Sequence, residues 1–113
     1  MSDAKNLLGL IGLCRRAGKT VIGTDMVCEH LRGRAKKGAA RDKIDVLVLE
    51  ASDTSENTHK KISDKCIFYN VKHIRLQFDG AALGKAVGKS YVAAVAVTDE
   101  NLCRAILEKS DLS

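Results

Sequence analysis

Two short and almost entirely aliphatic runs limit what this chain can fold into. One covers residues 44–49 (IDVLVL) and the other covers residues 91–97 (YVAAVAV). Such runs are typical of strands covered on both faces, because a strand with one wet face alternates apolar and polar residues. They are too short to span a membrane, which takes about 20 apolar residues. They therefore predict the central strands of a sheet with helices on both sides.

The segments around these runs alternate between helix and strand signals. Gly18 after two arginines predicts the end of a first helix, and Asp53 with Glu56 three positions later predicts an N-terminal capping box. We expect helices over residues 4–17, 24–36, 53–69 and 79–87 and from residue 98 onward, with short strands at 20–22 and 71–76. The order αβαβαβαβα predicts an α/β fold, a three-layer α/β/α sandwich, in one domain of 113 residues (1–113).

The charge of the chain is concentrated in its first part. Residues 1–43 hold ten Lys or Arg against four Asp or Glu, whereas residues 44–113 hold nine against ten. A basic half on a small domain indicates an anionic partner, most commonly nucleic acid, although a solvated surface has the same composition. The N-terminus lacks the layout of a secretory signal, so we expect a cytoplasmic protein with no membrane partner.

The cysteines and histidines form no pattern of a metal site or a catalytic nucleophile. Consecutive cysteines are 14, 38 and 37 residues apart and are mostly next to aliphatic residues. We therefore expect buried apolar thiols, no cofactor, no metal and no catalytic residue. The residues concerned are Cys14, Cys28, Cys66 and Cys103, with His30, His59 and His73.

Two segments imitate a phosphate-binding Walker A loop, residues 17–20 (AGKT) and 88–90 (GKS). That loop needs four residues between its glycines, followed by a helix. Here Gly12 and Gly18 enclose five residues, and Gly84 and Gly88 enclose three. We therefore expect no nucleotide hydrolysis, and because the sequence shows no pairing of a nucleophile with a base, we expect no other enzyme activity.

Four segments together resemble one family. They are residues 16–24 (RAGKTVIGT), 46–53 (VLVLEASD), 83–89 (LGKAVGK) and 92–97 (VAAVAV). In this order and spacing they resemble the kink-turn RNA-binding ribosomal-protein superfamily, the group of the archaeal proteins "L-seven-Ae" and "L-thirty-e", over about residues 5–108. Residues 51–58 (ASDTSENT) look most like its small bacterial members. The resemblance implies a four-stranded mixed sheet, no catalysis, and binding of a kink-turn, a sharply bent RNA helix–bulge–helix.

The resemblance also implies an RNA-binding face. Gly23 would allow close backbone approach, Thr24 and the following N–H groups would meet phosphate or a base edge, and Val87 would touch a turned-out base. The lysines would neutralise phosphates. The whole implied face comprises Lys19, Gly23, Thr24, Asp25, Lys36, Lys37, Ser52, Asp53, Val87, Gly88 and Lys89. Interpretations without RNA contact stay open for three of these residues. Val87 would then lie in the core, Gly23 would form a turn and Lys19 would be a solvated surface lysine.

Three residues depart from the family pattern Gly-x-Asn-Glu-x-x-Lys. Asp25, Met26 and Glu29 stand where the pattern has Asn, Glu and Lys. An ionised carboxylate only accepts hydrogen bonds, so Asp25 cannot bond to guanine O6 or N7, which are acceptors too. The alternative is a protein-interaction module on the same scaffold, through a homodimer or contacts with ribosomal proteins. The basic residues 36–43 offer a replacement contact surface for a structured RNA such as ribosomal RNA.

Overall fold

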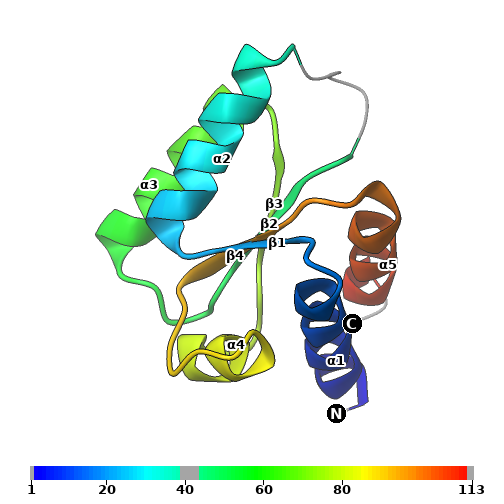
Figure 1. Cartoon of the computed structure of the whole chain (residues 1–113). Helices are drawn as coiled ribbons and strands as arrows, with labels where there is room; N and C mark the ends of the chain where they lie inside the picture. The colour runs from blue at the N-terminus through cyan, green and yellow to red at the C-terminus, as the bar shows by residue number, and fades with distance from the viewer. Residues whose placement is uncertain (1, 39–43, 112–113) are drawn as a thin grey trace.

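The computed structural model describes residues 2–38 and 44–111, and within them the predicted order of helices and strands is confirmed (Figure 1). The elements are α1 (Ser2–Arg16), β1 (Thr20–Ile22), α2 (Thr24–Lys36), β2 (Leu47–Glu50), α3 (Glu56–Phe68), β3 (Lys72–Arg75), α4 (Gly80–Ala86), β4 (Ala94–Val97) and α5 (Glu100–Asp111). None of these helices is long and apolar enough to cross a membrane.

The described strands form one mixed sheet in the order β1-β4-β2-β3. Strand β4 is antiparallel to both β1 and β2, whereas β2 and β3 are parallel. The two aliphatic runs therefore supply the central strands, as predicted. Because β1 and β2 both oppose β4, they point the same way, and their carboxyl ends meet at one edge of the sheet.

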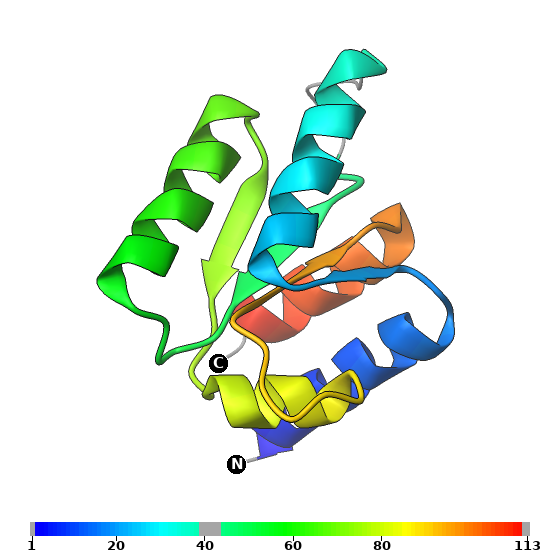
Figure 2. The same ribbon diagram turned by 60° about the vertical axis from the view of Figure 1, so that its left-hand side comes forward.

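Helices cover both faces of this sheet, which confirms the three-layer sandwich (Figures 1 and 2). Side chains of a strand alternate between the faces. Leu47 and Leu49 therefore join the core formed with α1, α4 and α5, whereas Val46 and Val48 join the core formed with α2 and α3. All four cysteines are buried in these layers, as expected. Burying one large aliphatic side chain contributes about 1.5–3 kcal/mol.

The structure corrects three predicted boundaries. Strands β2 and β4 begin three residues later than predicted, at Leu47 and Ala94. Helix α3 begins at Glu56, and its N-cap is Ser55, whose Oγ accepts a hydrogen bond from the backbone N–H of Thr58 at 3.2 Å. Asp53 is therefore not the cap, because tertiary contacts hold its carboxylate elsewhere.

Candidate nucleic-acid interface

One edge of the sheet brings together segments that are far apart in the sequence. The backbone N–H of Gly23 donates to the carbonyl oxygen of Ala94 at 2.9 Å, and that of Ala51 donates to Ala93 at 2.8 Å. The turn into α2, the loop after β2 and the segment leading into β4 therefore meet here. Figure 2 shows that segment running from α4 up to the sheet beneath the start of α2.

Helix α2 begins at this edge with a glycine. Gly23 has φ +100°, a conformation that side-chain-bearing residues rarely adopt, and no side chain caps the helix. The first bond of the helix runs from the N–H of Val27 to the Gly23 carbonyl. The N–H groups of Thr24, Asp25 and Met26 therefore point out of the first turn, where the helix itself supplies no acceptor. Such a turn carries partial positive charge and attracts anions.

The starts of the three following helices are different. Ser55, Asp79 and Asp99 each accept a hydrogen bond from a first-turn N–H, at 3.2, 2.9 and 3.0 Å for α3, α4 and α5. Among the helices α2 to α5, α2 alone begins without a side-chain cap. Its first turn is thus the one whose donors are left for water or a ligand.

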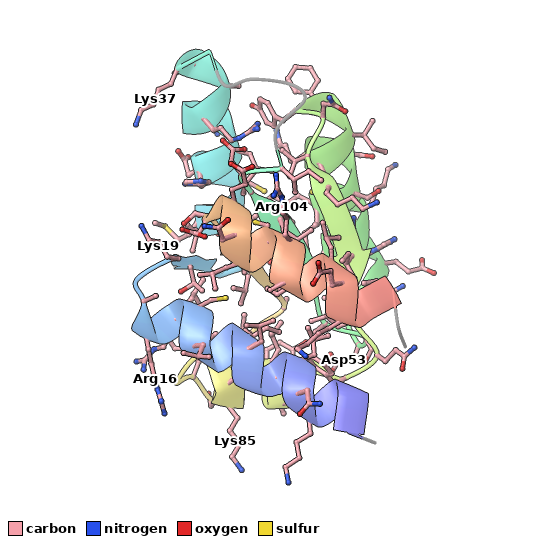
Figure 3. The ribbon with its side chains drawn as sticks, turned by 90° about the vertical axis from the view of Figure 1, so that its right-hand side faces the viewer. Arg16, Lys19, Lys37, Asp53, Lys85 and Arg104 are labelled. Atoms are coloured by element: carbon pink, nitrogen blue, oxygen red, sulfur yellow. The ribbon has the colours of Figure 1, made fainter. Side chains whose placement is uncertain are left out.

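Exposed cations at the end of α1, in the turn before β1, on α4 and in the loop before β4 form a group that we call the basic rim. Gly88 has φ +78°, and a Cβ there would lie 3.0 Å from Nη2 of Arg15, so the loop before β4 packs against the end of α1. Figure 3 shows Arg16, Lys19 and Lys85 on the same side of the molecule. The basic rim comprises Arg15, Arg16, Lys19, Lys85 and Lys89.

Not all predicted RNA-face residues converge. Lys36 and Lys37 lie at the far end of α2, whose 13 residues span about 20 Å, and Figure 3 shows Lys37 well apart from Arg16 and Lys85. Lys19 precedes β1, so that strand separates it from Gly23. Residues 39–43 of the basic segment 36–43 lie outside the described residues.

Two predicted contact residues have structural roles. The Val87 side chain is 1 % exposed and packs in the core of α1, α4 and α5, so the core alternative for it is correct. Oδ1 of Asp53 accepts from the N–H of Gly80 at 2.9 Å and from the Tyr91 hydroxyl at 3.4 Å. Asp53 therefore ties the loop after β2 to α4. Ser52, next to it, is exposed.

The residues that depart from the family pattern face solvent on α2. The Asp25 side chain is 88 % exposed and accepts a hydrogen bond from Nζ of Lys61 on α3 at 2.9 Å. That hydrogen bond raises the pKa of Lys61. Glu29 pairs with Arg32 one helical turn later at 3.4 Å. Each of these carboxylates thus has a cation beside it, and the edge is not dominated by negative charge.

A buried carboxylate behind the loop after β2 was not predicted from the sequence. Glu50 is 0 % exposed and accepts hydrogen bonds from Thr54, His59 and His73. Burial alone would raise the pKa of the Glu50 carboxyl, but these hydrogen bonds outweigh burial and lower it. Arg75 lies 3.7 Å from the carboxylate. The available signal was a charged residue ending a strand predicted to be buried on both faces, since such a charge needs partners.

Three of the four buried thiols are poor nucleophiles. Burial raises the pKa of Cys66 and of Cys103 to about 12, and it also raises the pKa of Cys14. A thiol with a pKa this high is protonated near neutral pH and is a poor nucleophile. These three cysteines therefore act as small apolar residues.

Comparison with known proteins agrees with the architecture. The chain is 36 % identical over 102 residues to "RNA-binding protein YlxQ" of Bacillus subtilis (strain 168), covering 90 % of this chain and 92 % of the relative. It is 35 % identical over 87 residues to the protein of the same name from Enterococcus faecium, covering 77 % and 75 %. A solved structure of a Bacillus halodurans C protein, described as being of unknown function, superposes with a TM-score of 0.75 at 28 % identity, covering 93 % of this chain and 96 % of that one.

The match to a family model extends over nearly the whole chain. Residues 5–107 fit the model described as the ribosomal protein L7Ae/L30e/S12e/Gadd45 family. This range agrees with residues 5–108, over which the four sequence segments resemble that group, and it includes every element that forms the candidate interface. The chain belongs to the ribosomal protein L7Ae/L30e/S12e/Gadd45 family.

Proposed function

We propose that this protein binds RNA without catalysing a reaction, and that its target is a bent helix–bulge–helix of the kink-turn type. The observation that carries the proposal is the uncapped first turn of α2, at the same edge of the sheet as the loop after β2 and the residues that lead directly into β4. Family membership and the name of the two curated relatives, "RNA-binding protein", support the same conclusion. RNA selectivity usually comes from irregular, opened sites, and such a site fits an edge built from several loops.

In this proposal each part of the edge has a separate task. The backbone at Gly23 approaches the RNA closely, and the first-turn N–H groups of α2 donate to a phosphate or a base edge. Ser52 and Gly88 lie in the two neighbouring loops. The basic rim neutralises phosphates on one arm of the RNA, and Lys36 and Lys37 contact phosphates only if the RNA follows α2 along its length. The family is described as one of ribosomal proteins, so ribosomal RNA is a target that we include in the proposal.

A binding titration tests the proposal. A kink-turn RNA and an ideal duplex of equal length are titrated at two salt concentrations. We expect tighter binding of the kink-turn, and affinity for both RNAs that falls with salt because phosphate contacts release counterions. Equal affinities for the two RNAs would refute shape selectivity. If neither RNA binds and the solution mass is that of a dimer, the chain is a protein-interaction module.

Two lysine substitutions test where the interface lies. Lys89→Ala should weaken binding of both RNAs and reduce the slope of log affinity against log salt by about 1, since one phosphate contact is lost. Lys72→Ala is the matched control. Lys72 is also exposed, but it begins β3 opposite Leu47, at the other end of the sheet. If Lys72→Ala weakens binding as much as Lys89→Ala does, the interface is not where we place it.

A further inference from the structure

Three side chains with metal-ligand chemistry converge at the end of β2, and nothing in the proposed RNA binding uses them. Glu50, His59 and His73 each offer one ligand atom, and these atoms all lie within 4.8 Å of one another. We propose that they form a binding site for a divalent transition metal ion, with Zn²⁺ as its preferred occupant. The spacing of histidines and cysteines along the sequence predicted no metal, because these ligands come from three separate elements.

The fold dictates this convergence. Glu50 and His73 lie on the neighbouring parallel strands β2 and β3, where Glu50 is in register with Arg75 and Val48 with His73. Side chains two residues apart on a strand lie on the same face of the sheet. His73 therefore shares a face with Arg75 and also with Glu50, the register partner of Arg75. Helix α3 covers this face and brings His59 in its first turn. Strands β2 and β3 and the helix α3 packed on them therefore bring three ligand side chains to one point.

The distances are compatible with coordination after a small adjustment. Oε1 of Glu50 lies 2.8 Å from Nδ1 of His59 and 2.7 Å from Nε2 of His73. Zinc bonds nitrogen and carboxylate oxygen at about 2.0–2.2 Å, which places tetrahedral ligand atoms about 3.3 Å apart. Each histidine nitrogen therefore needs to move about half an ångström away from Oε1, and the two histidine nitrogens, which lie within 4.8 Å of each other, need to reach the same separation of about 3.3 Å. The His59 side chain is 39 % exposed and has room to move outward.

The second oxygen of Glu50 holds the carboxylate in place. Oε2 accepts from the hydroxyl of Thr54, lies 3.7 Å from Nε of Arg75 and lies 2.8 Å from Nδ1 of His59, so the carboxylate presents Oε1 to His73 and both oxygens to His59. Hydrogen bonds of this kind orient metal-bound carboxylates. Arg75 also opposes a cation by its charge, but its Nη2 donates to the carbonyl oxygen of Ser52 at 3.3 Å, which holds it toward the loop. We therefore expect micromolar rather than nanomolar affinity.

The ligand set selects the class of metal. Two imidazoles and one carboxylate suit zinc and its neighbours in the first transition row, whereas magnesium and calcium prefer oxygen ligands alone. Three protein ligands leave a fourth tetrahedral position open for water. The partly exposed His59 provides the entry path from solvent.

Calorimetric titration of the chelator-treated, fully reduced chain with Zn²⁺ tests the site. We expect one equivalent to bind, and His59→Ala and His73→Ala each to weaken binding by at least tenfold. His30→Ala is the matched control, because His30 lies on α2 outside the cluster and should leave the affinity unchanged. Circular dichroism checks that each variant is folded. Glu50→Gln is not needed, since loss of the buried carboxylate endangers folding itself.

Cobalt substitution identifies the ligands by a second route. Co²⁺ bound to nitrogen and oxygen gives visible absorption without the strong near-ultraviolet band of a cobalt–thiolate bond, which sets this site apart from the four cysteines. The proposal is overturned if Zn²⁺ does not bind at micromolar concentration, if both histidine variants bind it as the wild type does, or if the thiolate band appears. RNA titrations run with chelator present keep this result separate from the proposed function.

Discussion

Helices α2 and α3 lie side by side on one face of the sheet and start at the same edge, yet their first turns are opposite in design (Figure 1). Helix α2 starts at Gly23 with no side-chain cap. Helix α3 starts at Ser55, which caps it, and its first turn also places His59 on the buried Glu50. The uncapped start of α2 is therefore a property of its own sequence, and the topology of the fold does not impose it on the other helices.

This contrast separates two kinds of residue at the edge. Around α3 the polar groups are satisfied by the protein, since no buried side-chain nitrogen or oxygen among the described residues lacks a partner. Around α2 the backbone donors are left to solvent or to a ligand. Substitutions near α3 should therefore change stability, and substitutions near α2 should change binding.

The largest effect should come from Glu50→Gln. The amide cannot match a carboxylate that accepts from two histidines and a threonine while facing Arg75, and removing one partner of a buried charged cluster costs about 3 kcal/mol. Urea unfolding of metal-free protein at pH 7 measures it. Glu56→Gln, an exposed change in the first turn of the same helix, should cost a few tenths of that value. Similar midpoints for the two variants would contradict a closed cluster.

The advantage of Glu50 over glutamine should also depend on pH. Because hydrogen bonds lower the pKa of the folded carboxyl, the unfolded chain takes up its proton first as the pH falls. The stabilisation is complete above the ordinary value of 4.5 and is lost as the pH falls through the lowered folded value. The difference in unfolding free energy between wild type and Glu50→Gln should thus shrink below pH 4.5 in chelator-containing buffer. A difference independent of pH would show that packing, not charge, is responsible.

The capping contrast predicts a smaller effect of about 1 kcal/mol. Ser55→Ala removes the acceptor of the Thr58 N–H and should lower stability by this amount, as loss of a cap does. Thr24→Ala, at the first position of α2, removes no side-chain cap and should leave stability within about 0.5 kcal/mol. Thermal or urea unfolding of both variants makes the measurement. Equal losses would mean that α2 has a cap in solution after all.

The sequence predicted the architecture well because its strongest signals are local. The aliphatic runs place β2 and β4 in the centre, and Gly18 ends α1 where expected, with φ +72°. The start of α3 was predicted wrongly because Asp53 and Ser55 are both good caps. Hydrogen bonds to Asp53 from Gly80 and Tyr91, which are distant in the sequence, accompany the choice of Ser55 as the cap.

The candidate site was predictable to a different degree. The resemblance to a family implied that the Gly23 turn and the loop of residues 87–89 form one face. Backbone hydrogen bonds at the sheet edge join Gly23 to Ala94 and Ala51 to Ala93, so they bring the start of β4 to the Gly23 turn, and contact with residues 87–89 stays a prediction. The position of Val87 stayed open because its exposure depends on how α4 packs on α1. The Glu50 cluster was missed, since its partners come from α3 and β3 and no spacing rule connects them.

The smallest expected effect concerns the uncapped start of α2. Asp25→Asn removes a negative charge from the first turn of α2 and adds an amide donor, which can meet guanine O6 or N7. We expect kink-turn affinity to rise about threefold, or about 0.6 kcal/mol, with little loss of stability, because the pair with Lys61 is exposed. Asp64→Asn removes the same charge from an exposed position on α3 and serves as the control. If both variants tighten binding equally, the gain reflects net charge alone, whereas a gain confined to Asp25→Asn places that residue against the RNA.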